Sequence, residues 1–363
     1  MGTYILRRLL LIVPTLIGIM ALNFLIIQFT PGGPIEQILA EVEDGAAGAT
    51  DRFTGGGDAG GGGQSGGEGS AYRGAQGLDP DFIAELEEQF GLDRPPLERF
   101  GLMLWNYMTF DFGDSFFRSI SVFDLILEKM PVSISLGLWT TLFSYLISIP
   151  LGVAKAVRDG SRFDAATSAV VISAYAIPGF LFAILLLVLF AGGSFVQWFP
   201  LRGLTSDNWE QLSLFGKIID YFWHLTLPLL SMMIAGFATL TLLTKNSFMD
   251  EIRKQYVMTA RAKGLSERRV LYGHVFRNAM LIVIAGFPGA FLAVFFTGAL
   301  FVETVFSLDG LGLLGFESVV SRDYPVVLAT LWIVGLMGLL VKLISDLTYV
   351  WIDPRIDFER REG

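Results

Sequence analysis

The sequence alternates between long apolar runs and polar stretches that are rich in charged residues and glycine. A helix needs about 20 mostly apolar residues to cross the hydrocarbon core of a membrane. Six segments reach roughly that length, so the pattern predicts an all-α integral membrane protein with six transmembrane helices. The predicted spans are Leu9–Phe29, Val132–Ala154, Ala165–Ala191, Leu225–Leu243, Met280–Leu300 and Val326–Ile344.

The composition supports a membrane protein and excludes several kinds of chemistry. Of the 363 residues, 53% are hydrophobic and 17% are charged, with a mean hydropathy of +0.57, whereas soluble domains carry more charge. The absence of cysteine excludes a disulfide framework, a thiolate metal site and a cysteine nucleophile. The two histidines, His224 and His274, are far apart in sequence, so no multi-histidine metal site is expected.

The distribution of lysine and arginine predicts the orientation of the spans. The N-terminus, residues 155–164, residues 245–279 and the C-terminal tail hold 16 Lys and Arg, and the longer loops on the opposite side hold 9. Because cytoplasmic loops carry an excess of these residues, both termini are expected in the cytoplasm. The opposite loops hold 25 of the 35 acidic residues, which accounts for the net charge of −9.

The predicted spans divide the chain into segments. These are an N-terminal transmembrane helix (1–30), an outer loop (31–130), a five-helix core (131–353) with a basic cytoplasmic loop at about 245–279, and a cytoplasmic tail (354–363). The first span follows Arg7 and Arg8, and its apolar run is too long for a cleaved signal peptide. We therefore expect it to be retained as a membrane anchor.

The outer loop contains two contrasting stretches. Residues from about 45 to 77 are rich in glycine and of low complexity, which predicts flexible coil. In the next stretch, about 79–90, Phe82, Leu86 and Phe90 share one face of a short amphipathic helix. This helix either lies on the membrane or the spans, or presents a docking surface to an outer partner.

The middles of the predicted spans contain no Asp, Glu, Lys, Arg or His. Ionisable residues inside a bilayer are costly and usually mark functional sites, so an intramembrane hydrolase or an ion-driven carrier lacks the groups that it needs. Lys342 and Asp346 lie one helical turn apart near the inner end of the last span and are predicted to pair. The sequence predicts no catalytic residue, bound cofactor or metal, so any energy for transport must come from another protein.

Prolines occur within the predicted spans, among them Pro14, Pro178, Pro228 and Pro288. Each proline removes a helical hydrogen bond and can bend its helix. These bends either help the helices pack or curve them around a pathway.

The stretch from Gln255 to Ala279 is strongly basic although apolar runs flank it. The residues from Asp250 to Ala262 have the periodicity of a helix. Gly264 then allows a turn that residues with a Cβ resist, and Ser266 can cap a second helix. Two helices joined at a glycine would project from the membrane, held there either by anionic lipid or by a docked protein.

This stretch resembles the cytoplasmic coupling loop, or EAA motif, of ABC importer permeases, and most closely that of the oligopeptide/dipeptide branch. The branch reads close to Y-V-x-T-A-R-A-K-G followed by H-x-x-R-N-A. The matching residues, to which the resemblance assigns contact with an ATPase, are Tyr256, Thr259, Ala260, Arg261, Ala262, Lys263, Gly264, His274, Arg277 and Asn278. Met258, Thr259 and Arg277 depart from the general motif at its Glu, first Ala and terminal Pro, as is usual in the peptide branch.

Other stretches along nearly the whole chain agree with this resemblance. They are YILRRLLLIVPTLIGI, FGLDRP, FGDS, FVETVFSLDGLGLL and DPRID. Within the branch, the chain is most similar to the B permeases of Yej-type importers of microcin C and oligopeptides. The Gly-rich stretch falls outside the resemblance.

The resemblance implies a type I ABC importer permease in the bacterial inner membrane. Its implied partners are a second, homologous permease in a heterodimer, ABC ATPase subunits as two chains or one fused chain, a periplasmic solute-binding protein and membrane lipid, with no nucleic acid. ATP and Mg²⁺ would be bound by the ATPase and not by this chain, which is not expected to be an enzyme. The residues of the outer loop expected to face the binding protein are Glu303, Phe306, Gly310 and Gly312.

The implied cargo is an oligopeptide or a peptide-like compound of the microcin C type, moved from periplasm to cytoplasm. Dipeptides, nickel chelates and other small solutes of the same branch are alternatives. An ion-coupled secondary transporter or a passive channel would instead work without an ATPase.

Overall fold

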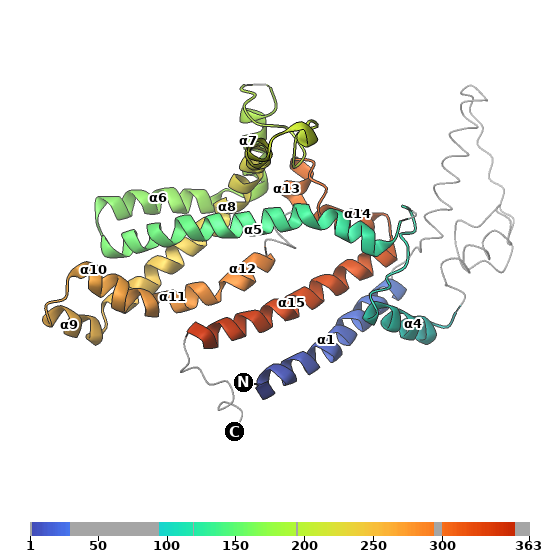
Figure 1. The fold of residues 1–363 in the computed structure, drawn as a ribbon, viewed down its shortest axis with the longest axis horizontal. Coiled ribbons are helices and arrows are strands. Elements are labelled where there is room, and N and C mark those ends of the chain that lie inside the picture. The colour runs from blue at the N-terminus through green and yellow to red at the C-terminus, as the bar shows by residue number, and fades with distance from the viewer. Residues whose placement is uncertain (1, 30–93, 119, 194, 294–299, 353–363) are drawn as a thin grey trace, which may run out of the picture. The chain divides into compact units, whose positions relative to one another are not determined.

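The computed structural model describes residues 2–29, 94–118, 120–193, 195–293 and 300–352 (Figure 1). The predicted Gly-rich stretch, the amphipathic helix at about 79–90 and the cytoplasmic tail lie outside the described residues.

The regular elements of the described residues are all helices, which confirms the all-α prediction. They are α1 (Gly2–Phe29), α4 (Pro96–Met108), α5 (Val122–Val157), α6 (Arg162–Ala176), α7 (Gly179–Phe190), η1 (Trp209–Gln211), α8 (Leu214–Ile252), α9 (Gln255–Ala262), α10 (Glu267–Val270), η2 (Leu271–Val275), α11 (Phe276–Ala285), α12 (Phe287–Ala293), α13 (Leu300–Val305), α14 (Leu311–Val320) and α15 (Tyr324–Ile352).

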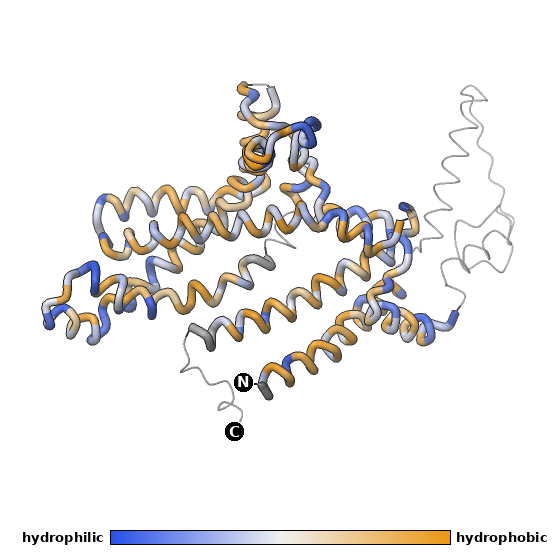
Figure 2. Tube along the Cα trace, viewed as in Figure 1, coloured by the Kyte–Doolittle hydropathy of each residue, from blue (hydrophilic) through white to orange (hydrophobic). Residues whose placement is uncertain are grey.

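The apolar helices correspond to the six predicted spans. In the part of the chain that the structure describes, four helices are each long and apolar enough to cross a membrane, and two bent pairs bring the number to six. Figure 2 shows hydrophobic residues along α1 and α15, while hydrophilic residues gather where α9 meets α10. The hydropathy pattern therefore located the apolar helices. The fifth of them covers Glu267–Ala290, whereas the predicted span was Met280–Leu300, of which residues 294–299 lie outside the described residues.

The third predicted span is not one straight helix. It consists of α6 and α7, which meet at an angle of 95°. Pro178 immediately precedes α7, and Ile177 before it has an extended backbone. A proline ring disfavours the helical conformation in the residue that precedes it. The prediction of a single span over Ala165–Ala191 is thus corrected to two helices with a sharp bend.

The fourth predicted span belongs to α8, a helix of 39 residues. It bends by 52° between Ile234 and Gly236. Pro228 lies inside the first half of α8, so this bend lies C-terminal to the proline.

The packing of the described chain separates it into two units. Of the described residues, the first unit comprises those within 2–12, 126–314 and 334–352, and the second comprises those within 13–29, 94–125 and 315–333. In the first unit, α8 packs against α6, α7 and α11. A Cβ on Gly152 of α5 would lie 2.6 Å from the Cβ of Thr244, so only glycine permits the close approach of α5 and α8 there.

The second unit has its own small core. The ring centroid of Phe112 lies 5.0 Å from that of Tyr107 and 5.7 Å from that of Trp332. Beside it, the buried carboxylate of Asp323 accepts hydrogen bonds from Ser115 Oγ at 2.5 Å and from the backbone N–H of Phe116 at 3.2 Å. These bonds satisfy a buried charge next to the aromatic cluster.

The predicted pairing of Lys342 with Asp346 is wrong. The carboxylate of Asp346 accepts a hydrogen bond from Tyr4 at 2.9 Å and forms an ion pair with Arg8 at 3.0 Å. Both partners lie on α1, so this α1–α15 clasp brings the beginning of the first helix to the end of the last. That arrangement supports the prediction that both termini lie on the same side of the membrane.

Candidate functional site

The predicted coupling loop folds as two short helices around a glycine turn. α8 ends at Ile252, and α9 begins at Gln255 after a break at Arg253 and Lys254. The prediction of one helix over Asp250–Ala262 is therefore corrected to the end of α8 followed by a separate helix. The turn at Gly264 has a φ of +79°, which confirms the expectation that glycine is needed there.

The apolar face of α9 anchors the loop to the spans. Val257 and Ala260 are buried in a cluster with Phe248 of α8 and with Val270 and Val275 beyond the turn. Because residues from both sides of Gly264 share this core, the loop is a packed body and not a loose linker.

Polar contacts also tie α9 to the neighbouring helices. The hydroxyl of Tyr256 donates to Glu251 at 2.7 Å and is hydrogen-bonded to Asn278. Burial raises the pKa of the Tyr256 hydroxyl, and the bond to Asn278 opposes that shift. Arg261 forms an ion pair with Glu267 at 2.9 Å, which bridges the turn.

The outward face of the loop is polar and basic. The predicted contact residues that are exposed are Thr259, Arg261, Ala262, Lys263, Gly264, His274, Arg277 and Asn278. Tyr256 is partly buried and Ala260 is buried, so these two position the loop. Behind it lies a cavity of about 370 Å³, lined by the ends of α5 and α8 and by α10 and η2.

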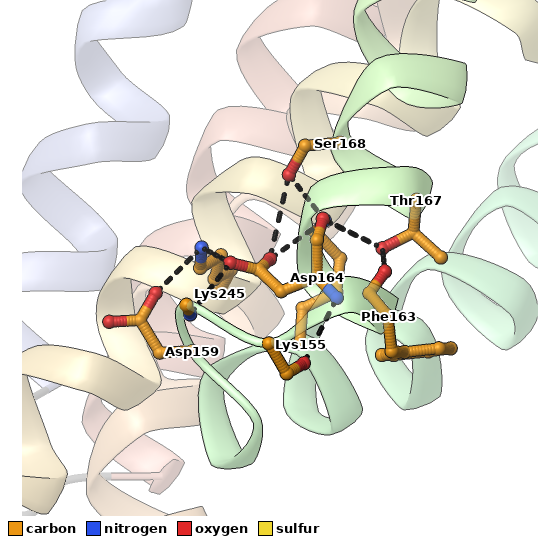
Figure 3. Close-up of polar contacts among 9 residues, drawn as sticks. Lys155, Asp159, Phe163, Asp164, Thr167, Ser168 and Lys245 are labelled. Carbon is orange, nitrogen blue, oxygen red and sulfur yellow. Dashed lines mark hydrogen bonds and ion pairs between the residues drawn. The ribbon is translucent and has the colours of Figure 1, made fainter.

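A buried ionic cluster, which the sequence analysis missed, lies at the ends of α5, α6 and α8 (Figure 3). The side chain of Lys155 is 0% exposed, and its Nζ lies 3.0 Å from Asp164 Oδ1. It also donates to Thr167 Oγ1 at 2.9 Å and to Ser168 Oγ at 2.7 Å. These polar partners of Lys155 Nζ all belong to α6.

A second lysine shares the same carboxylate. Lys245 of α8 lies 2.7 Å from the other oxygen of Asp164 and 2.9 Å from Asp159. Asp164 thus joins three helices, and α8 leads from Lys245 directly into the coupling loop. The sequence does place charges of opposite sign at the inner ends of three successive spans. The sequence analysis treated these residues only as loop charges.

The outer loop after α13 closes over a buried carboxylate. Glu303 is 0% exposed and accepts hydrogen bonds from the backbone N–H of Leu313 at 2.7 Å and from Ser133 Oγ at 3.3 Å. A Cβ on Gly310 would lie 2.3 Å from Glu303 Oε1, and one on Gly312 would lie 3.0 Å from Oε2. The glycines make room for the carboxylate.

This geometry changes the expected role of four outer residues. The side chains of Glu303 and Phe306 are buried, so the expectation that they face outward is corrected. Gly310 is also buried and Gly312 is partly buried. These residues give the loop its shape.

Burial raises the pKa of the Glu303 carboxyl above its ordinary value of 4.5. The folded protein then holds this proton more tightly than the unfolded chain does, so the contribution to stability is complete below about pH 4.5 and is lost as the pH rises through the raised pKa. Glu303→Gln should lack this dependence. We expect the difference in unfolding temperature between wild type and the variant to change across this window.

Thermal unfolding in detergent between pH 4 and 8 measures this effect. The exposed Glu317→Gln provides the control, since the Glu317 side chain is 50% exposed. Parallel pH profiles for wild type and Glu303→Gln would contradict the assignment.

Comparisons with known proteins show what this arrangement is similar to. Residues 148–358 match the family described as "Binding-protein-dependent transport system inner membrane component". The peptidoglycan transport system permease protein YejB of Agrobacterium fabrum (strain C58) is 67% identical over 363 residues, covering 100% of both chains. The inner membrane ABC transporter permease protein YejB of Escherichia coli O157:H7 is 58% identical, covering 99% of this chain and 100% of that protein.

More distant relatives extend the comparison. The oligopeptide transport system permease protein AppB of Bacillus subtilis (strain 168) is 33% identical over 99% of this chain and 100% of its own length. Among solved structures, an inward-facing MetNI methionine ABC transporter matches with a TM-score of 0.46 and 14% identity, covering 63% of this chain and 96% of that one.

Proposed function

Because this chain belongs to the family of inner-membrane components of binding-protein-dependent transport systems, we propose that it is a permease subunit of an ATP-driven importer of peptide-like compounds. It forms part of the passage for the cargo and receives mechanical work from an ATPase at its cytoplasmic face. Transport runs from the periplasm to the cytoplasm across the bacterial inner membrane.

The structure of the coupling loop is the main observation that supports this proposal. Its inner face is packed against the spans through Val257 and Ala260, while its outer face exposes Arg261, Ala262 and Lys263. A packed element moves as a rigid body, so a displacement that an ATPase applies to the exposed face reaches α8 and α11. The bridge of Asp164 extends that path from α8 to α5 and α6.

The remaining partners follow from this arrangement. A second, homologous permease completes the passage as a heterodimer, and a periplasmic binding protein delivers cargo to the outer loops. ATP and Mg²⁺ are bound by the ATPase subunits, which are two chains or one fused chain. This permease itself carries out no covalent chemistry.

The relatives support peptide-like cargo in two forms. The relative at 33% identity is named for oligopeptide transport, and the resemblance to Yej-type permeases adds peptide antibiotics such as microcin C. The relative at 67% identity is named for peptidoglycan transport, which makes peptide-bearing fragments of peptidoglycan the second candidate.

Deletion of Ala260–Gly264 should release the ATPase from membranes while the permease stays inserted, because it removes the exposed turn. Ala260 is buried, so Ala262→Trp offers a milder change that places a bulky side chain on the exposed face of α9. We expect either variant to lower co-purification of the ATPase and ATP-dependent uptake by tenfold or more.

Affinity purification in mild detergent, followed by identification of the bound chains, measures the first effect. Gln211→Trp, at an exposed position of η1 away from the coupling loop, is the matched control. Retention of the ATPase and of uptake in both loop variants would refute the coupling role.

A further inference from the structure

The helix α4, in the second unit, has an apolar face that the described residues leave exposed. A helix turns by about 100° per residue, which divides the side chains of α4 into three sectors. The sector packed on the protein holds Phe100, Met103, Leu104 and Tyr107. The polar sector holds Glu98, Asn106 and the C-cap residue Thr109, with Leu102 among them. The third sector is apolar and exposed, and it holds Leu97, Gly101, Trp105 and Met108.

The apolar sector is open along its whole length. Leu97, Trp105 and Met108 are 86%, 68% and 55% exposed. Gly101 lies between them, and a Cβ added to it would meet no atom within 4 Å. An exposed apolar patch beside polar residues marks a surface for a membrane or a partner, and tryptophan is enriched where a membrane meets water. The depth of α4 decides between these two occupants.

The contacts of α4 with α1 fix the depth of its first half. The ring centroid of Phe100 lies 5.4 Å from that of Phe24, and Arg99 donates to Gln28 Oε1 at 2.8 Å. A helix crosses the hydrocarbon core in about 20 residues, which end at Gln28 when counted from Arg8, the last charged residue before the apolar run. Phe24 lies one turn earlier, roughly 6 Å inside that edge. This half of α4 is therefore level with the boundary between acyl chains and headgroups.

The second half of α4 meets the outer end of another span. The hydroxyl of Tyr107 donates to the carbonyl of Pro325 at 3.3 Å, and Pro325 immediately precedes the predicted span Val326–Ile344. Arg99 and Tyr107 are about 12 Å apart along α4, yet each contacts the outer end of a span. These two contacts lay α4 along the membrane surface, because an upright helix would hold them at different depths.

We propose that α4 is an interfacial helix whose apolar sector is buried in the outer leaflet of the membrane. Such helices sink their apolar face about 5–10 Å into the boundary between headgroups and acyl chains, which agrees with the contact between Phe100 and Phe24. A water-soluble partner reaches only the polar sector with Glu98 and Asn106, because the apolar sector lies below the headgroups. α4 thus fastens the predicted outer loop to the bilayer shortly before the chain enters α5.

Because the chain contains no cysteine, a single introduced thiol can carry a nitroxide spin label. Leu97→Cys and Trp105→Cys report on the apolar sector, and the adjacent exposed positions Glu98→Cys and Asn106→Cys are the matched controls. The full-length permease is reconstituted with cysteine-free partner chains in vesicles of phosphatidylethanolamine and phosphatidylglycerol. Power saturation then compares collisions of each label with oxygen, which enters lipid, and with chromium oxalate, which stays in water.

We expect the ratio of oxygen to chromium oxalate collisions to be about threefold higher at positions 97 and 105 than at positions 98 and 106, because only the first two reach the acyl chains. Equal ratios at all four positions would place the apolar sector in water and overturn the proposal. Labels at positions 97 and 105 that neither reagent reaches would also overturn it, since protein would then cover this face, either residues 30–93 or a partner chain.

A charge introduced into the apolar sector gives a second measurement. Gly101→Cys carries the label, because the space around its Cβ is open. Trp105→Glu should lower the collision ratio at position 101 by about threefold, since a carboxylate is costly among acyl chains. Asn106→Glu, one residue further along in the polar sector, should leave the ratio unchanged. If Trp105→Glu also leaves it unchanged, the helix is not buried in the leaflet.

Discussion

Replacing Asp164 by asparagine should destabilise the protein by about 3–5 kcal/mol, the usual effect of removing one partner from a buried ion pair. Lys155 has no exposed side-chain surface and Lys245 is 14% exposed, so the two ammonium groups would then face each other without the carboxylate between them. We expect loss of yield and of unfolding temperature in detergent, together with loss of ATP-dependent uptake.

Two variants separate the buried bridge from its exposed neighbour. Asp159→Asn removes a carboxylate that is 41% exposed and contacts only Lys245 in the cluster, so a change of about 0–1 kcal/mol is expected. Lys155→Met combined with Asp164→Asn removes the buried cation and should recover part of the stability. If the effects of Lys155→Met and Asp164→Asn on the free energy of unfolding are additive, Lys155 and Asp164 do not act as a pair.

Gly310→Ala should disrupt the outer loop, because its new Cβ would lie 2.3 Å from Glu303 Oε1. Overpacking of this kind costs about 1–3 kcal/mol. Moving the carboxylate would also break its bonds to Leu313 and Ser133, at a further cost of about 1–3 kcal/mol. Unfolding temperature and uptake should both fall.

The matched substitution is Gly315→Ala in α14, where the nearest atom to the new Cβ would be Thr330 Cγ2 at 3.7 Å, an ordinary contact. It should leave stability within about 0.5 kcal/mol of wild type. Truncating the carboxylate in the double variant Glu303→Ala/Gly310→Ala should recover part of the loss. A Gly310→Ala protein as stable as wild type would show that the loop does not close on Glu303.

The sequence predicted the features that depend on local pattern. Apolar runs located the six spans because a bilayer requires that length in every spanning helix. Gly264 marked the turn of the coupling loop because its positive φ is costly for other residues. Val257 and Ala260 lie three positions apart in a stretch with helical periodicity, and both are buried on one face of α9.

Features that depend on contacts between distant segments were missed or mistaken. Asp346 was paired with Lys342 because they are neighbours on one helix, whereas its partner Arg8 is 338 positions away in the numbering. Lys155, Asp164 and Lys245 come from three helices, and nothing local indicates that they meet. The burial of Glu303 depends on Ser133 and on glycines beyond the next turn. Periodicity reports which face of a helix is apolar, and it does not report what that face touches.

The α1–α15 clasp has a consequence for biogenesis. The residues of α1 are translated before those of α15, so Arg8 is made before the carboxylate of Asp346 exists. The domain cannot close until translation has nearly finished, and a nascent chain halted before position 346 keeps its leading cation without this counter-ion.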